Sequence, residues 1–130
     1  MPETTPRTVS SKYRGTREYH LVYSELIRAA QYRGTTTYQE LAAIMGLPSR
    51  GSHMAREVGH LLGEISDDEI AESRPMLSAV AVGVSGEPGS GFFGLAFDFG
   101  KLARDASKDE RERFWRQECE AVYQTWQPRR

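Results

Sequence analysis

The sequence predicts a mainly helical α+β fold. Four segments carry apolar residues at the three- and four-residue spacing of an amphipathic helix. Between the third and the fourth lies a run of small and β-branched residues around the turn-forming stretch SGEPGSG. Two of the helical segments also open with a capping-box pattern, Ser or Thr followed three residues later by Glu. These observations indicate a helical domain with one small β element.

Composition limits the class of protein. The chain has 130 residues, of which 38% are hydrophobic and 27% charged, a balance typical of one globular domain. The opening Pro-, Thr- and Ser-rich stretch predicts a flexible arm over residues 1–14, and residues 15–130 are expected to form a single domain. We find no signal-peptide pattern, no apolar run long enough for a membrane span, and one cysteine, Cys119. A cytoplasmic protein without a membrane partner is therefore expected.

The first two helices have clear ends in the sequence. Apolar residues recur at helical spacing over about residues 17–33, and Gly34 provides the stop. The second helix lies within TYQELAAIMGLP, where Thr37 and Glu40 form the capping box. Gly46 and Pro48 end it. The result is one longer helix followed by a short one.

A third helix follows the turn SRGS. Met54, Val58, Leu61, Leu62 and Ile65 fall on one face of it, and polar residues lie outside that face. Two helices joined by a short turn that contains glycine are typical of a helix-turn-helix.

The run of β-branched residues predicts a β-hairpin. Residues 76–84 are expected to form its first strand and residues 91–97 its second, with Pro88 and the neighbouring glycines in the turn. The stretch FFGLAFDFG is also compatible with the start of a helix. A final helix begins with the capping box of Ser107 and Glu110 and carries an aromatic stripe. Together the elements predict a winged helix-turn-helix with a two-stranded β-hairpin wing and an added C-terminal helix.

The order of three motifs resembles a known family. TTYQELAAIMGLP, AREVGHLLGEI and PMLSAVAVGVSGEPGSGFFG together resemble the C-terminal winged-helix domain of O6-alkylguanine-DNA alkyltransferases and alkyltransferase-like proteins, over about residues 35–94. The resemblance implies that Tyr38 lies against the phosphate beside the target nucleotide. It also implies that Arg56 enters the base stack and holds a base extruded.

The chain departs from this family at the alkyl acceptor. Where the family has the motif P-C-H-R-V, this sequence reads Ser78-Ala79-Val80-Ala81-Val82. Without that cysteine, alkyl transfer by the family's route is excluded. We therefore expect a non-enzymatic protein with no catalytic residue and no cofactor.

The leading hypothesis is binding to double-stranded DNA. Net charge is −1, but residues 1–34 hold six Arg and Lys against three Asp and Glu, so a basic surface is expected near the N-terminus. Such side chains bind phosphate, while the first turns of a recognition helix reach base edges. The candidate DNA-binding residues are Tyr38 of the second helix, Arg50, Ser52, His53 and Arg56 of the recognition helix, and Lys12, Arg14 and Arg17 of the basic segment.

Two other functions are compatible with the sequence. A protein-interaction module could use an acidic helix end over residues 64–72 together with Phe92 and Phe93, exposed on the hairpin. A small enzyme could place a site between the PGSGFF turn and His53, Glu57 and His60, whose spacing also allows a metal site on one helix face. Since no further ligand or complete catalytic set accompanies them, we expect no metal.

Overall fold

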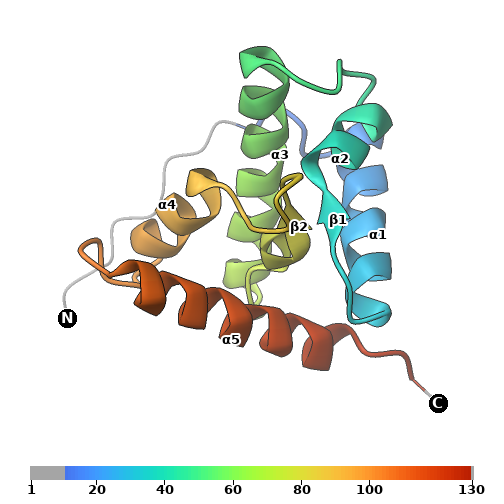
Figure 1. Ribbon diagram of the computed structural model, residues 1–130. Helices are drawn as coiled ribbons and strands as arrows, with labels where there is room; N and C mark the ends of the chain where they lie inside the picture. The colour runs from blue at the N-terminus through green and yellow to red at the C-terminus, as the bar shows by residue number, and fades with distance from the viewer. Residues whose placement is uncertain (1–10, 130) are drawn as a thin grey trace.

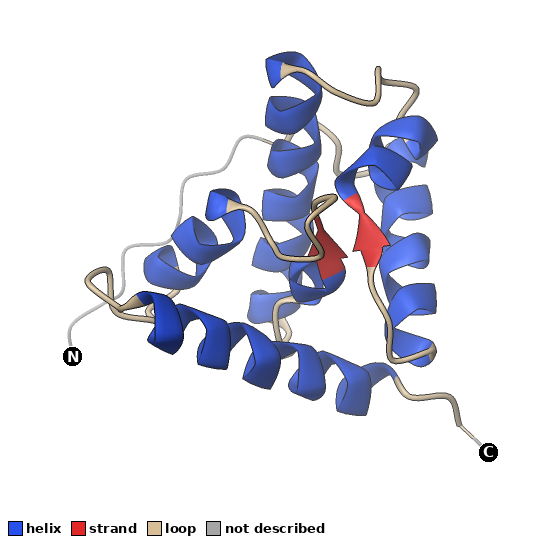
Figure 2. Ribbon diagram, viewed as in Figure 1, coloured by secondary structure: helices blue, strands red, loops and turns tan. Residues whose placement is uncertain are grey.

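The computed structural model describes residues 11–129, so residues 1–10 of the predicted arm and Arg130 lie outside the described range. The predicted mainly helical α+β fold is confirmed in its coarse form (Figures 1 and 2). In chain order, the elements are α1 (Arg17–Gln31), β1 (Thr36–Thr37), α2 (Tyr38–Ile44), α3 (Ser52–Ala71), the 3₁₀ helix η1 (Leu77–Val80), β2 (Ala81–Val82), α4 (Ser90–Asp98) and α5 (Lys108–Trp126). Among the described helices, none combines the length and apolar composition that crossing a membrane requires.

The helix ends follow local capping chemistry. The N-terminal turn of α5 has the complete predicted capping box, in which the Ser107 side chain and the Glu110 side chain each accept a backbone N–H of the other residue. In α2 only half of the box forms. Thr37 Oγ1 accepts the Glu40 N–H at 3.1 Å, but the Glu40 carboxylate accepts the hydroxyl of Thr36 at 3.2 Å. The predicted ends of α1 and α2 are otherwise confirmed to within about two residues.

The predicted β-hairpin is wrong. Residues 77–80 form η1, and of the predicted first strand only Ala81 and Val82 form a strand; they pair in parallel with Thr36 and Thr37 of β1. The predicted second strand is the helix α4, because Phe92 and Ala96, four residues apart, are both buried on one face. The helical alternative for FFGLAFDFG is therefore confirmed, and residues 83–89 form a loop between β2 and α4 rather than a wing turn.

Helix α3 is longer than its apolar stripe predicts. It continues to Ala71 through most of the acidic stretch 64–72 that the sequence offers as the helix end of an interaction module. Glu64 and Glu69 are fully buried there. Glu69 pairs with Arg74 at 3.0 Å and accepts the hydroxyl of Tyr23, so its charge is compensated inside the fold.

The centre of the molecule is the segment formed by η1 and β2. Helices α1, α3 and α5 pack around η1 (Figure 1), and Leu77, Val80 and Ala81 are completely buried there. The carbonyl oxygen of Ala79 accepts two hydrogen bonds from α5, one from the indole of Trp115 at 2.9 Å and one from the thiol of Cys119 at 3.3 Å. This central segment therefore fixes how the helices sit around the pocket described next.

Candidate functional site

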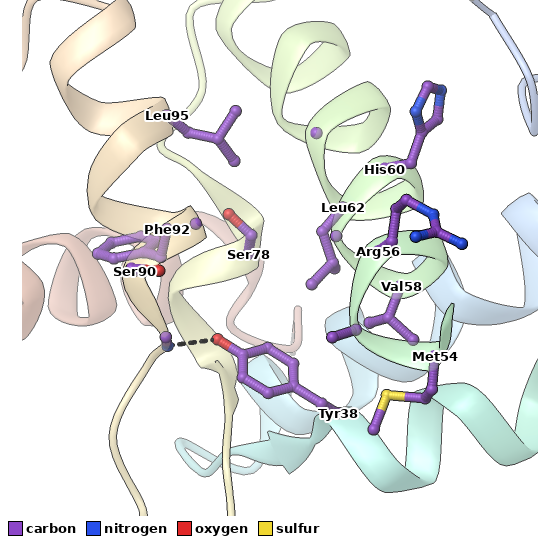
Figure 3. Close-up of a pocket in the computed structure, with 15 residues that line it drawn as sticks. Tyr38, Met54, Arg56, Val58, His60, Leu62, Ser78, Ser90, Phe92 and Leu95 are labelled. Atoms are coloured by element: carbon purple, nitrogen blue, oxygen red, sulfur yellow. Dashed lines mark hydrogen bonds between the residues drawn. The ribbon is translucent and has the colours of Figure 1, made fainter. Parts of the chain in front are cut away.

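A pocket of about 780 Å³ opens between α3 and α4, with α2 at one end (Figure 3). Its walls are largely apolar and include hydroxyl groups; Arg56 and His60 belong to the lining, but their side chains point away from the cavity, on the outer side of α3 (Figure 3). The apolar lining consists of Met54, Val58, Leu62, Phe92 and Leu95. The polar and cationic side chains of the lining are Tyr38, Arg56, His60, Ser78 and Ser90. This combination of apolar walls with a few convergent polar groups is typical of a small-molecule or cofactor site.

Small residues create the space of the pocket. Along α3, Ala55, Gly59 and Gly63 line it at four-residue spacing, which places them on one side of the helix. On α4, Gly91 lines it as well. A Cβ atom at Gly59 or Gly91 would meet no neighbouring atom within 4 Å. Larger side chains at these positions would therefore occupy the pocket instead of colliding with its walls.

Tyr38 closes the end of the pocket nearest α2. It is the first residue of α2, directly after β1, and its hydroxyl accepts the backbone N–H of Gly89 at 2.8 Å (Figure 3). This bond uses a lone pair of the hydroxyl and leaves its proton to be donated elsewhere. Burial raises the pKa of Tyr38. A neutral hydroxyl group therefore faces the pocket.

Arg56 lies at the rim, on the α3 side. Two thirds of its side chain (67%) is exposed, and its guanidinium has one nitrogen 3.4 Å from Nδ1 of His53. Arg50 and Ser52 are exposed at the same N-terminal end of α3, as is His53. The structure thus brings four predicted residues to one end of α3, and one of them, Arg56, shares the pocket with Tyr38.

The predicted basic residues of the N-terminal segment lie elsewhere. Lys12 Nζ is 2.5 Å from Glu57 Oε1, and Arg14 pairs with Asp68 at 3.0 Å, so both are bound to acidic residues of α3. Arg17 is exposed in the first turn of α1. None of the three lines the α3–α4 pocket.

Some residues that the sequence offers for a protein-binding surface or an enzyme site are arranged differently in the structure. Phe92 is only 4% exposed and stacks against Phe93 and Phe114, so it is not an exposed hairpin residue. His53, Glu57 and His60 do not form a metal-binding group, and across residues 11–129 no cluster of three or more His, Cys, Asp or Glu side chains has that arrangement.

Several pocket residues were missed by sequence reasoning. Ser78 is not among the predicted site residues, yet it lies in the pocket wall, where its hydroxyl is 2.8 Å from that of the buried Ser66. Ser90 and Gly91 belong to the first turn of α4, which has no side-chain cap. The four-residue spacing of Ala55, Gly59 and Gly63 was the one signal in the sequence that could have indicated an open helix face.

Glu57 makes the stability of the fold depend on pH. The hydrogen bond from Lys12, followed by that from the Tyr13 hydroxyl, lowers the pKa of Glu57 to about 2 from its ordinary 4.5. Because the folded pKa is the lower one, the stabilisation is fully present above about pH 5 and is lost as the pH falls toward 2. We expect the difference in unfolding midpoint between wild type and Glu57→Gln, measured by circular dichroism, to shrink over this range. A difference that stays constant from pH 6 to pH 2 would contradict this assignment.

Comparison of the chain with protein-family models, with curated proteins and with solved structures yields no match. The case for a function therefore depends on the pocket and its rim.

Proposed function

We propose that this chain is a non-enzymatic protein that binds double-stranded DNA through the N-terminal half of α3 and accepts an extruded nucleotide in the α3–α4 pocket. The observation that supports this most is that Tyr38 and Arg56 border one pocket although they belong to different helices. These are the two residues that the resemblance places beside the phosphate and in the base stack. Their common location is what such a pair of roles requires.

The chemistry of the pocket suits a nucleobase. A base has two apolar faces and a polar edge, and the pocket offers apolar walls with hydroxyl groups on Tyr38 and Ser90. No acidic residue lines it, so phosphate at its mouth meets no like charge from the lining. The uncapped N-terminus of α4 adds backbone donors and a partial positive charge, which favour phosphate or carbonyl oxygen.

The surroundings of Ser78 and Cys119 support a binding role without chemistry. Ser78, the first residue where the family's acceptor motif would stand, is 3% exposed, and its hydroxyl is engaged with Ser66. Cys119 is buried on α5, and burial raises its pKa to about 11, so it is a thiol at neutral pH. A thiol of this kind is a poor nucleophile.

Fluorescence anisotropy with labelled duplex DNA tests the proposal. We expect salt-sensitive binding, tighter for a duplex with an extrahelical or O6-alkylated guanine, and a loss of roughly tenfold or more in affinity for Arg56→Ala. Arg113→Ala is the matched control, because it removes the same charge from an exposed position on α5. Its effect should stay within about twofold.

Two results would contradict the proposal. Failure to bind any of these duplexes at low salt would exclude DNA binding by this face and leave the protein-interaction hypothesis to be tested. Equal losses for Arg56→Ala and Arg113→Ala would indicate nonspecific attraction of phosphate to the whole protein rather than contact through α3.

A further inference from the structure

Residues 11–14 cover an acidic face of α3. Glu57, Glu64 and Asp68 lie seven and four residues apart, which places them on one side of the helix. The Glu64 carboxylate accepts the backbone N–H groups of three successive residues, Lys12, Tyr13 and Arg14, at 2.9–3.2 Å. Lys12 and Arg14 then pair with Glu57 and Asp68 through their side chains. The segment therefore binds all three acidic groups of that face.

Glu57 is the member of this set that adjoins the proposed DNA-binding surface. Its Oε1 atom receives both Lys12 Nζ, at 2.5 Å, and the hydroxyl of Tyr13. Its Oε2 atom is 3.9 Å from Nε of Arg56, which is beyond hydrogen-bond distance. Only 9% of the Glu57 side chain is exposed, against 67% of the Arg56 side chain. The carboxylate is thus turned inward, and the guanidinium next to it in the sequence is turned outward.

We propose that Lys12 is a positioning residue for Arg56: it holds the Glu57 carboxylate inward and so keeps the Arg56 guanidinium free for DNA. This inference rests on the proposed function. Without Lys12, the nearest cation for Glu57 is Arg56, because Nε is already within 4 Å of Oε2. A small rotation would then give the charge-assisted pair that arginine and carboxylate groups form readily. The Glu57 carboxylate would then compensate the positive charge of Arg56, and it would place a negative charge near the DNA phosphate.

This role differs from the direct phosphate contact that the sequence predicts for Lys12. A direct contact would require Lys12 to leave the Glu57 carboxylate, which is 2.5 Å away and largely buried. The two roles also differ in how they depend on Glu57. If Lys12 acts through Glu57, removing the Glu57 charge makes Lys12 dispensable. If Lys12 binds phosphate itself, removing the Glu57 charge does not make Lys12 dispensable.

Four variants test the inference by anisotropy with the same labelled duplexes. Lys12→Met is expected to weaken binding about tenfold, and Lys12→Met with Glu57→Gln to restore it to within about twofold of wild type. Glu57→Gln alone should change binding little. Lys108→Met, which removes the same charge at an exposed position of α5, is the control and should also change it little. A double variant that binds no better than Lys12→Met would overturn the positioning role.

The dependence of affinity on salt separates the two roles further. Loss of a phosphate contact reduces the steepness of the plot of log affinity against log salt concentration by about one. Glu57→Gln cannot restore that steepness if Lys12 itself binds phosphate. A positioning role predicts that the double variant recovers the wild-type slope. A slope that stays reduced in the double variant would assign Lys12 to phosphate instead.

A measurement without DNA separates this inference from the proposed function. The Arg56 Nε–H resonance, identified in ¹H–¹⁵N spectra by its absence from Arg56→Ala, is expected to shift in Lys12→Met and to return in the double variant. An Arg56 resonance unchanged by Lys12→Met would overturn the inference even if wild type binds DNA. If the resonance shifts but wild type binds no duplex, the proposed function fails while the coupling of Lys12 to Arg56 stands. Thermal melting of each variant checks that the fold is retained.

Discussion

Glu64→Ala is expected to lower the free energy of unfolding by about 2–4 kcal/mol. Glu64 is fully buried, and its carboxylate accepts the backbone N–H groups of Lys12, Tyr13 and Arg14. Its removal leaves these donors without their acceptor and releases residues 11–14 from α3. The loss stays below the full cost of three orphaned donors, because the released segment can reach water. Urea denaturation followed by circular dichroism measures the change.

Glu112→Ala is the matched control for this prediction. Glu112 lies on α5 and pairs with Arg116 at 3.0 Å, but 47% of its side chain is exposed. Exposed pairs of this kind contribute at most about 0.5 kcal/mol. A loss for Glu64→Ala no larger than that for Glu112→Ala would show that residues 11–14 are not anchored through Glu64.

Gly59→Leu is expected to reduce affinity for a duplex with an extrahelical nucleotide by at least about tenfold, through steric exclusion from the pocket. The new side chain enters open space, because a Cβ atom at Gly59 has no neighbour within 4 Å. The same change replaces a glycine in the interior of α3, which favours the folded state by roughly 0.5–1 kcal/mol. Stability should therefore rise while binding falls, measured by thermal melting and anisotropy.

Gly94→Leu controls for the chemistry of the substitution. Gly94 is interior to α4, its Cβ position also has no neighbour within 4 Å, and it does not line the pocket. Its affinity should match that of wild type. If Gly59→Leu binds the extrahelical duplex as wild type does, the pocket does not receive the nucleotide, whatever Arg56 contributes on the surface.

The sequence predicted the helices well where their ends depend on neighbouring residues. The capping box of Ser107 and Glu110 is a local pattern, and the structure confirms it. Thr37 caps α2 as expected, but the Glu40 carboxylate accepts the hydroxyl of Thr36 instead of the backbone N–H of Thr37. The spacing of the residues does not decide between these two neighbouring donors. The reliable part of the prediction was thus the position of α1, α2 and α5.

The β element could not be predicted because its partner is remote. Ala81 and Val82 pair with Thr36 and Thr37, which lie 45 residues earlier in the chain. A run of small and β-branched residues looks the same whether it pairs with its neighbour in a hairpin or fills a protein's centre. The glycine-rich turn that followed it favoured the hairpin, although residues 90–98 carry a helical burial pattern.

The site was predicted in part. Tyr38 and Arg56 were identified through the resemblance, and the structure brings them to one pocket. The pocket's other residues come from α3, η1 and α4, and sequence patterns carry no information on how these elements meet. The burial of acidic residues on α3 could not be predicted for a related reason. Glu64 finds its donors about 50 residues away in the chain, and an unpaired glutamate is expected to be solvated.

The burial of η1 has a consequence for the order in which the protein can fold. The helices that cover it come from both ends of the chain, and Ala79 is bonded by two side chains of α5. During synthesis, α5 leaves the ribosome after α1, α3 and η1, so until then η1 lacks part of its cover. Contacts between such distant segments also slow folding. The nascent chain therefore depends on α5 to complete its buried centre, and chaperone binding during translation is expected to target the apolar segment around residues 76–82.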